Sequence, residues 1–308
     1  MNPITQPLLG VVRPTTVLRT PGLSQRLKAE VTLISETFQH TGSFKFRAAY
    51  NVAAQVAQRR IITASSGNFG QALAYACSLL GKEAIVVMPS TAAGVKIRAV
   101  REYGATVELI DVNEKSRAQR VAELASDFPD AYVASAYDDP LVIAGNASLG
   151  QEIAQLDTAF DAVIVPVGGG GLSSGLIKGL RESGSTVSVV GAEPLLANDA
   201  ARSLQCGRIV ANGAEPQTLA DGARTLSLGR CNWEILQKDM EAIIEVPEAA
   251  IAEGVRLLFE LANLKAEPTA ALAIGALLTE PERFQKRQVC CVISGGNVDP
   301  LLYRDILI

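Results

Sequence analysis

The segment 162–180, AVIVPVGGGGLSSGLIKGL, indicates which class of fold this chain adopts. Residues 162–167 form an apolar run with the length of a buried strand, and from residue 171 the apolar residues recur with the spacing of a helix. Four consecutive glycines join the two parts, and glycine tolerates the sharp turns that such a junction needs. The segment therefore predicts a strand that is followed directly by a helix, the repeating unit of α/β folds.

The same alternation of short apolar runs and longer amphipathic stretches continues on both sides of this segment. Besides 162–167, strands are expected at residues 61–64, 84–88, 106–110, 131–134, 186–191 and 288–293. Helices are expected at residues 67–80, 92–103, 114–128, 141–155, 171–182, 247–261 and 269–278. Strands that alternate with helices form parallel sheets covered on both faces. The predicted fold class is therefore α/β, with mostly parallel sheets flanked by helices.

A chain of 308 residues is long enough for two domains. The strand–helix alternation is dense between residues 51 and 139, which predicts a small domain there. This small domain would be inserted into a large domain made of residues 1–50 and 140–308. The cluster Asp138–Asp139–Pro140 breaks regular structure and marks a crossing point between the two domains.

Bulk composition excludes several classes of protein. The formal net charge is −4 and basic residues form no patch, which argues against a nucleic-acid partner. The apolar runs are too short to cross a bilayer, and the first ten residues do not resemble a secretory signal. A single histidine, His40, excludes a site built on several histidines. The five cysteines lack zinc-site spacing and are expected to be buried free thiols of a cytoplasmic protein: Cys77, Cys206, Cys231, Cys290 and Cys291.

Three polar or glycine-rich segments follow predicted strands: 65–71, 168–175 and 294–297. In open α/β sheets, ligands bind beyond the carboxyl ends of the strands, so these segments form the candidate site. Four glycines ahead of a helix can point several N–H groups at an anion. Because the spacing fits neither a dinucleotide fingerprint nor a P-loop, a single phosphate is favoured over a nucleotide. The alternative is a tight turn without a ligand.

Two further features allow either a chemical or a purely structural interpretation. The segment 65–71, SSGNFGQ, can offer hydrogen-bond donors to a carboxylate, or Ser65 or Ser66 can simply cap a helix. Lys45 stands between Phe44 and Phe46, and an apolar setting lowers the pKa of a lysine and makes it nucleophilic. A surface lysine whose methylene groups cover apolar side chains is the structural alternative.

Taken together, the motifs of this chain resemble those of one family. They are TGSFK at 41–45, SSGNFGQ at 65–71, PVGGGGLSSG at 166–175, AEP at 192–194, TLADG at 218–222, EPT at 267–269 and SGGN at 294–297. They resemble the fold type II pyridoxal-phosphate enzymes, which share the fold of the tryptophan synthase β subunit, and most closely the serine/threonine dehydratases and serine racemase. The resemblance covers residues 36–299, and it implies that pyridoxal 5'-phosphate (PLP) is held between two domains.

The resemblance also implies roles for individual residues. Lys45 would hold PLP as a Schiff base, Phe44 would lie against its ring, and Asn68 would hydrogen-bond the ring hydroxyl. Ser294 would meet the pyridine nitrogen. The phosphate group would lie against Gly168, Gly169, Gly170, Gly171 and Leu172. The substrate carboxylate would be bound by Ser65, Ser66, Gly67 and Asn68.

The implied reaction converts a small β-hydroxy amino acid to a keto acid and ammonia: the hydroxyl group leaves as water, and ammonia is then released by hydrolysis. Lys45, released from PLP by the substrate amine, would remove the α-proton, and the cofactor would delocalise the remaining charge. A serine opposite the pyridine nitrogen leaves that nitrogen unprotonated, which favours loss of the hydroxyl group. L-Serine, L-threonine and 3-hydroxyaspartate all suit this mechanism. Phe69 replaces the histidine that these dehydratases usually carry beside the substrate.

Three other activities stay open. Ser66 would face the substrate opposite Lys45, so it could exchange a proton there and make the chain an amino acid racemase. A β-replacement enzyme of the cysteine synthase type is a second alternative, although its loop usually carries threonine where Phe69 and Gly70 fall. A non-catalytic protein that binds an anionic metabolite at residues 168–171 is a third, and Lys45 argues against it.

The resemblance extends to a metal site and to the quaternary structure. The segment 193–199 resembles the divalent-cation segment of serine racemase, with ligands from Glu193, the carbonyl group of Ala197, and Asp199. Oxygen ligands suit Mg²⁺ or Ca²⁺. The alternative is an ordinary helix start with an acidic residue in its first turn. Relatives are commonly dimers, so a homodimer is expected.

Overall fold

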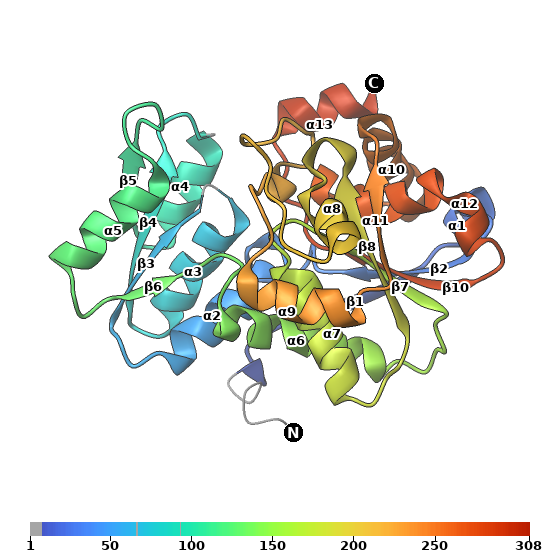
Figure 1. Cartoon of the computed structure of the whole chain (residues 1–308), viewed down its shortest axis with the longest axis horizontal. Helices are drawn as coiled ribbons and strands as arrows, with labels where there is room; N and C mark the ends of the chain where they lie inside the picture. The colour runs from blue at the N-terminus through green and yellow to red at the C-terminus, as the bar shows by residue number, and fades with distance from the viewer. Residues whose placement is uncertain (1–7, 66, 93) are drawn as a thin grey trace.

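The computed structural model describes residues 8–65, 67–92 and 94–308, and this part of the chain forms two separate β-sheets (Figure 1). All neighbouring strands of the larger sheet are parallel except the edge strand β1, which runs antiparallel to β2. Its strands follow the order β1 (Thr16–Arg19), β2 (Glu30–Ser35), β10 (Gln288–Ile293), β7 (Ala162–Pro166), β8 (Ser188–Pro194) and β9 (Ala242–Val246).

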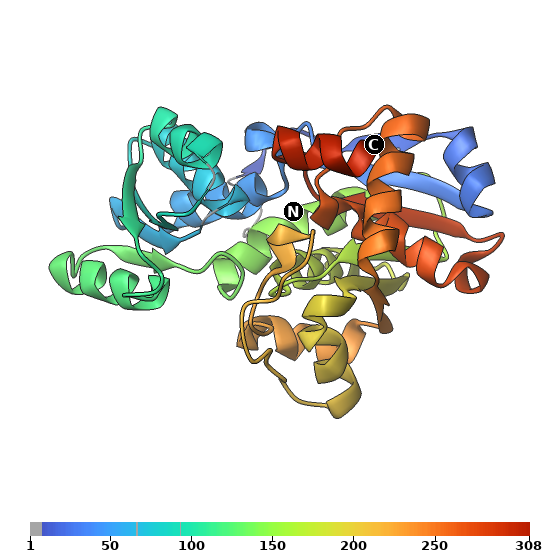
Figure 2. The same cartoon turned by 90° about the horizontal axis from the view of Figure 1, so that it is seen from above.

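The smaller sheet is parallel throughout. Its strands follow the order β5 (Thr106–Ile110), β4 (Glu83–Pro89), β3 (Arg60–Ala64) and β6 (Tyr132–Ala134). Figures 1 and 2 show the two sheets in two lobes that lie side by side. The predicted α/β fold with two mostly parallel, helix-flanked sheets is therefore confirmed. The boundaries 51–139 against 1–50 and 140–308 separate the strands of the two sheets, and as exact limits they stay a prediction.

Helices follow most of the strands. The α-helices are α1 (Pro21–Leu27), α2 (Lys45–Gln55), α3 (Asn68–Leu79), α4 (Gly94–Glu102), α5 (Arg117–Asp127), α6 (Pro140–Ala154), α7 (Gly171–Glu182), α8 (Asp199–Cys206), α9 (Arg230–Asp239), α10 (Glu248–Ala262), α11 (Pro268–Thr279), α12 (Pro281–Phe284) and α13 (Pro300–Leu307). Short 3-10 turns form at His40–Gly42, Leu195–Ala197 and Asp221–Ala223. None of the helices in the described ranges is long and apolar enough to span a membrane.

The alternation of side chains along strand β4 explains how the smaller sheet buries both of its faces. Val86 and Met88 pack into the cluster formed with α2, α3 and α4, whereas Ile85 and Val87 pack against α5. Successive side chains of a strand point to opposite faces, so a sheet covered on both faces needs apolar residues at every position. This requirement accounts for the continuous apolar run in β4.

The larger sheet follows the same principle, and its helices are packed unusually close. Ile164 lies in one core cluster and Val163 in the other, on opposite faces of β7. On the second face, α6 and α7 approach so closely that a Cβ atom on Gly179 would lie 1.9 Å from the carbonyl oxygen of Ala147. Glycine is required at such a contact, and it lets the second half of α7 pack directly against α6.

Several expected elements agree with the structure, and some features were not predicted. The expected strands 106–110 and 288–293 and the expected helix 171–182 coincide with β5, β10 and α7. Strands β1, β2 and β9 and helix α2 were not predicted. The expectation of buried thiols is wrong for Cys206, which is exposed at the end of α8, and Cys231 is only partly buried.

Candidate active site

A cavity of about 870 Å³ lies between the two sheets, at the carboxyl ends of β3, β7 and β10. The three segments that were expected to follow strands all contribute to its lining. From them come Ser65, Gly67, Asn68 and Phe69, the loop residues Gly168, Gly169, Gly170, Gly171 and Leu172, and Ser294. Parallel strands end at the same edge of their sheet, which is why segments far apart in sequence meet here.

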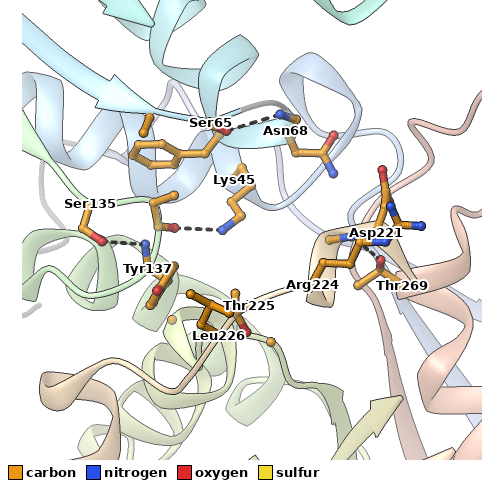
Figure 3. A pocket seen from close by; sticks show the side chains of 18 of the residues that line it. Lys45, Ser65, Asn68, Ser135, Tyr137, Asp221, Arg224, Thr225, Leu226 and Thr269 are labelled. Atoms are coloured by element: carbon orange, nitrogen blue, oxygen red, sulfur yellow. Dashed lines mark hydrogen bonds between the residues drawn. The ribbon is translucent and has the colours of Figure 1, made fainter. Parts of the chain in front are cut away.

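Lys45 is the first residue of α2 and reaches into this cavity (Figure 3). Its Nζ donates a hydrogen bond to the carbonyl oxygen of Ala136 at 2.8 Å. The same atom lies 4.9 Å from the ring centroid of Phe44 and 5.8 Å from that of Phe69. Burial lowers the pKa of Lys45 to about 8, although Glu267 opposes the shift. A sizeable fraction of the amine is therefore neutral and nucleophilic near neutral pH.

The second aromatic ring beside Lys45 is not the one that its sequence neighbours suggest. Phe46 packs on His40, with ring centroids 4.8 Å apart, and lies in the core next to α3. Phe69, at the start of α3, takes the place beside the amine instead. The two phenylalanines that flank Lys45 in sequence thus have different roles, because residues two positions apart at a helix start point to different sides.

The four glycines turn the chain from β7 into α7 in a space too tight for larger residues. Gly170 has a φ of 93°, in the left-handed region that favours glycine. A Cβ atom on Gly169 would lie 2.3 Å from the ring of Tyr137. The loop can therefore carry its backbone along the cavity wall, and the start of α7 adds positive potential there. This arrangement suits a phosphate group.

Ser294 directly follows β10 and is almost completely buried at the cavity wall. Its Oγ has no hydrogen-bond partner among the residues that the structure describes. A buried hydroxyl group without a partner is destabilising by about 1–3 kcal/mol. A ring nitrogen held next to Ser294 would satisfy this hydroxyl, so the residue fits the role expected of it.

Asn68 belongs to a buried polar network that the sequence did not suggest. Its Nδ2 donates to both carboxylate oxygens of Glu267 at 3.0 Å, and its Oδ1 accepts from Asn297 Nδ2 at 2.8 Å. Burial raises the pKa of Glu267 to about 7, and the nearby Asp221 adds to the shift, while Asn68 opposes it. Glu267 belongs to the EPT motif, which was the only signal in the sequence for its presence in the site.

Ser65 acts at the start of a helix and also lines the cavity, and its role at the substrate carboxylate stays a prediction. It lines the cavity, and its Oγ accepts hydrogen bonds from the backbone N–H groups of Gly67 at 3.4 Å and Gly70 at 3.1 Å. These two bonds fix the start of α3 in the manner of a capping residue. Ser66 lies outside the described residues.

Charged side chains close the cavity where the two domains face each other. Lys96 on α4 forms an ion pair with Asp221 at 2.6 Å, and Arg117 on α5 forms a longer one with Glu215 at 3.5 Å. Each pair joins a helix beside the smaller sheet to a loop beside the larger one. All four residues line the cavity. The shape of the site therefore depends on how the two domains are placed, because the ion pairs that join the domains are part of its lining.

The candidate metal ligands lie apart from the cavity, at the end of β8 and the start of α8. The oxygens of Glu193 accept hydrogen bonds from the backbone N–H groups of Ala200 and Ala201, at 3.0 and 2.9 Å. Asp199 Oδ1 accepts from Asn212, whereas the buried Oδ2 has no partner in the described part of the chain. Burial raises the pKa of Asp199 to about 6, and burial together with Asp199 raises the pKa of Glu193.

Comparisons with known proteins agree with this geometry. The family model described as pyridoxal-phosphate dependent enzyme matches residues 8–295. The chain is 36% identical to an L-threo-3-hydroxyaspartate ammonia-lyase of a Pseudomonas species, over 97% of this chain and 95% of that one. It is 34% identical to human serine racemase, over 92% and 86%. A solved threonine deaminase from T.th. superposes with a TM-score of 0.91 and 37% identity, over 96% of both chains.

Proposed function

Because the chain belongs to the pyridoxal-phosphate dependent enzymes, we propose that the cavity holds PLP with its phosphate group on residues 168–172 and its reactive end at Lys45. The chain is a PLP-dependent ammonia-lyase of the dehydratase type. Its similarity to the L-threo-3-hydroxyaspartate ammonia-lyase and to the threonine deaminase extends over nearly the whole length of those proteins. The position of Lys45 carries the proposal, since its amino group shares one cavity with the glycine loop and with Ser294.

The residues around Lys45 would hold the other parts of the cofactor. The unpartnered hydroxyl of Ser294 would face the pyridine nitrogen, and the ring of Phe44 would cover one side of the ring system. The amide nitrogen of Asn68 carries two protons, so it can serve Glu267 and a ring hydroxyl together. Glu267 and Asn297 fix the orientation of this amide from behind.

The chemistry then depends on proton movement at Lys45. When bound, PLP supplies an electron sink for the electrons released at the substrate Cα. The neutral amine of Lys45 would take the α-proton, with the backbone carbonyl of Ala136 orienting it beforehand. Loss of the β-hydroxyl group as water, followed by hydrolysis that takes up one water and releases ammonia, leaves a keto acid. The substrate carboxylate would lie at Ser65 and Gly67, and the role of Ser66 stays a prediction.

Arg117 selects the substrate class in this proposal. Besides Lys45, three cations line the described part of the cavity, and two of them are engaged: Lys96 binds Asp221 at 2.6 Å, and Arg224 donates twice to a backbone carbonyl. Among the residues that the structure describes, the one ionic contact of Arg117 is with Glu215, at 3.5 Å. A guanidinium group binds carboxylates in two-point geometry. We therefore propose a substrate with a second carboxylate, 3-hydroxyaspartate, in preference to serine or threonine.

Replacing Arg117 with glutamine should impair the dicarboxylic substrate selectively. We expect kcat/KM for 3-hydroxyaspartate to fall roughly 10- to 100-fold, which corresponds to the loss of one hydrogen bond to a charged group. In contrast, kcat/KM for L-serine should change less than about threefold, because this substrate has no second carboxylate to bind Arg117. Keto acid formation from each amino acid measures both values. Arg101→Gln, the same substitution on the exposed side of α4, should leave both rates unchanged.

The outcomes of this experiment separate two kinds of error. If the wild-type protein forms no keto acid from any β-hydroxy amino acid, the ammonia-lyase function is wrong. If it forms keto acid only from serine or threonine, or if Arg117→Gln lowers all rates equally, the dicarboxylic substrate is wrong and the function stands.

Racemisation is a second candidate because human serine racemase is as similar to this chain as several ammonia-lyases are. The same incubations should be analysed for the D-amino acid. We expect the keto acid to exceed it, because the serine opposite the pyridine nitrogen favours loss of the hydroxyl group over return of the proton. A predominance of D-amino acid would make the chain a racemase, with Ser66 as the candidate second base.

A divalent cation, Mg²⁺ or Ca²⁺, is proposed at Glu193, the carbonyl group of Ala197, and Asp199. The described residues contain no cluster of three or more His, Cys, Asp or Glu side chains suited to a metal. The proposed set needs only two carboxylates and a carbonyl group. The buried, unpartnered Oδ2 of Asp199 fits a cation, and the oxygens of Glu193 keep free lone pairs beside their bonds to α8.

Removing divalent cations should destabilise the protein. If the site is filled at about 100 times its dissociation constant, chelation removes about 2.7 kcal/mol, which lowers Tm by roughly 5 °C. Thermal unfolding with and without EDTA, and after Mg²⁺ or Ca²⁺ is restored, measures the effect. Asp199→Asn should abolish the response, whereas Glu282→Gln, at an exposed helix start, should keep it. An unchanged Tm in metal-free protein would argue against the site.

The assembly and the location of the protein are also proposals. We infer a homodimer, because large apolar side chains such as Phe259 on α10 and Leu301 on α13 are exposed in the single chain and suit burial against a second copy. A cytoplasmic location follows from the free thiols and stays a prediction.

A further inference from the structure

The carbonyl groups of three consecutive glycines in the loop are held from behind. The oxygen of Gly169 accepts hydrogen bonds from Asn232 Nδ2 at 2.7 Å and from the N–H of Gly229 at 3.1 Å. The oxygen of Gly170 accepts hydrogen bonds from the backbone N–H of Ser174 at 2.8 Å and from the hydroxyl group of Ser173 at 3.1 Å, both in the first turn of α7. The oxygen of Gly171 accepts from Asn146 Nδ2 at 3.0 Å.

These bonds also determine where the N–H groups of the loop point. The peptide groups are trans and planar, so each N–H points opposite to the carbonyl of the residue before it. The N–H groups of Gly170, Gly171 and Leu172 therefore point away from the groups that hold the carbonyls. They donate to no other group in the described ranges, and their residues line the cavity. Three N–H donors without another partner thus border the space where a phosphate would bind.

Asn232 and Asn146 are the side chains that hold this arrangement, and they come from outside the loop. Asn232 lies on α9 and Asn146 on α6, and both are completely buried. Neither lines the cavity. In each, the Oδ1 atom has no partner among the described residues, so burial of the amide is destabilising. An apolar residue would suit the packing better, which indicates that the donated hydrogen bond is the function of the side chain.

Asn232 also connects the loop to Tyr137, which lines the same cavity beside the loop. Its Nδ2 donates to the carbonyl oxygen of Tyr137 at 3.1 Å, and the ring of Tyr137 packs on Gly169. The carboxylate of Asp138 accepts hydrogen bonds from the first N–H groups of α9, at 3.1 and 2.9 Å. These bonds hold α9 against the segment after β6. Asn232, on α9, in turn holds the carbonyl group of Gly169 in the glycine loop.

We propose that Asn232 and Asn146 are positioning residues for the cofactor phosphate: they orient two of the three N–H donors of the glycine loop, those of Gly170 and Leu172, without touching the phosphate. The proposal rests on the proposed function, because the phosphate in question is that of PLP. Each asparagine holds one carbonyl group of the loop, and Asn232 also holds that of Tyr137, whose ring packs on Gly169, so Asn232 has the larger effect.

The test compares PLP with pyridoxal, which has the same ring and aldehyde but no phosphate group. The cofactor is removed from the wild-type protein and from the variants Asn232→Ala and Asn146→Ala, and the dissociation constants of PLP and pyridoxal are measured by cofactor absorbance. We expect Asn232→Ala to raise the constant for PLP about tenfold, roughly the loss of one hydrogen bond to a charged group, and to leave that for pyridoxal within about twofold.

Asn51→Ala is the matched control. Asn51 is also completely buried, and its Nδ2 donates to the carbonyl oxygen of Leu141 at 2.7 Å, away from the loop. This variant should leave the preference for PLP over pyridoxal unchanged. If Asn232→Ala does not fold, Asn146→Ala carries the test alone. An equal loss of PLP and pyridoxal binding, or the same loss of preference in Asn51→Ala, would overturn the proposal. Failure of the wild type to bind PLP would instead refute the proposed function.

Discussion

Replacing Lys45 with alanine should abolish turnover and leave PLP without a covalent link to the protein. Lys45 is both the candidate attachment point and the candidate base, and its amine is the one directed into the cavity beside Phe44 and Phe69. Loss of a general base alone lowers rates by about 10²–10⁴-fold, and loss of the attachment point adds to this. Keto acid formation, together with retention of the cofactor after denaturation, measures the result.

The pH dependence of cofactor attachment gives a second measure of Lys45. Only the neutral amine attacks an aldehyde, and burial lowers the pKa of Lys45 to about 8. The rate at which cofactor-free protein binds PLP covalently should therefore rise with pH until it levels off above about 8. An unshifted lysine would still gain rate well above about pH 9.

A matched lysine provides the control. Lys82 is half-buried, and its Nζ donates to the carbonyl oxygen of Val56 at 2.5 Å, as Lys45 does to Ala136. Lys82→Ala should retain covalent PLP and activity. Substantial elimination by Lys45→Ala, or covalent PLP in that variant, would show that another residue does this work.

Replacing Arg47 with methionine should destabilise the protein by about 3–5 kcal/mol, because it leaves a buried carboxylate without its partner. Arg47 and Glu36 are both completely buried, and two hydrogen bonds of 2.7 and 2.9 Å join them. A third bond, of 2.5 Å, runs to Glu152 on α6. Methionine keeps much of the volume, so the loss reports the missing charge. Urea unfolding measures it.

Two further variants identify the cause of this loss. Arg304→Met removes an arginine from an exposed ion pair with Asp305 and should change the free energy of unfolding by less than about 1 kcal/mol. Adding Glu36→Gln to Arg47→Met should recover part of the stability, because the unpaired charge is then removed. If Arg47→Met costs no more than Arg304→Met, the buried ion pair does not stabilise α2, and Lys45 at its start is positioned by other contacts.

The sequence alone determined the α/β class and the segments of the site, because these depend on local patterns. Helix α7 and strand β10 were predicted to the residue, since glycines bound the helix start and a polar turn ends the strand. Helix α2 was missed because its buried face includes polar residues, Arg47 and Asn51, which hide the apolar periodicity of a helix. Their partners lie on other segments, and no local pattern announces them.

Only the tertiary structure decided which side chains surround the reactive lysine. Phe69 lies beside Lys45 in place of Phe46, and Glu267 meets Asn68 across 199 positions of the sequence. Asn232 comes to the glycine loop from α9, although nothing in the segment around it suggests a functional residue. Such contacts form where separate strand ends and helices converge, so they depend on how the whole chain closes around the cavity and not on the residues next to them.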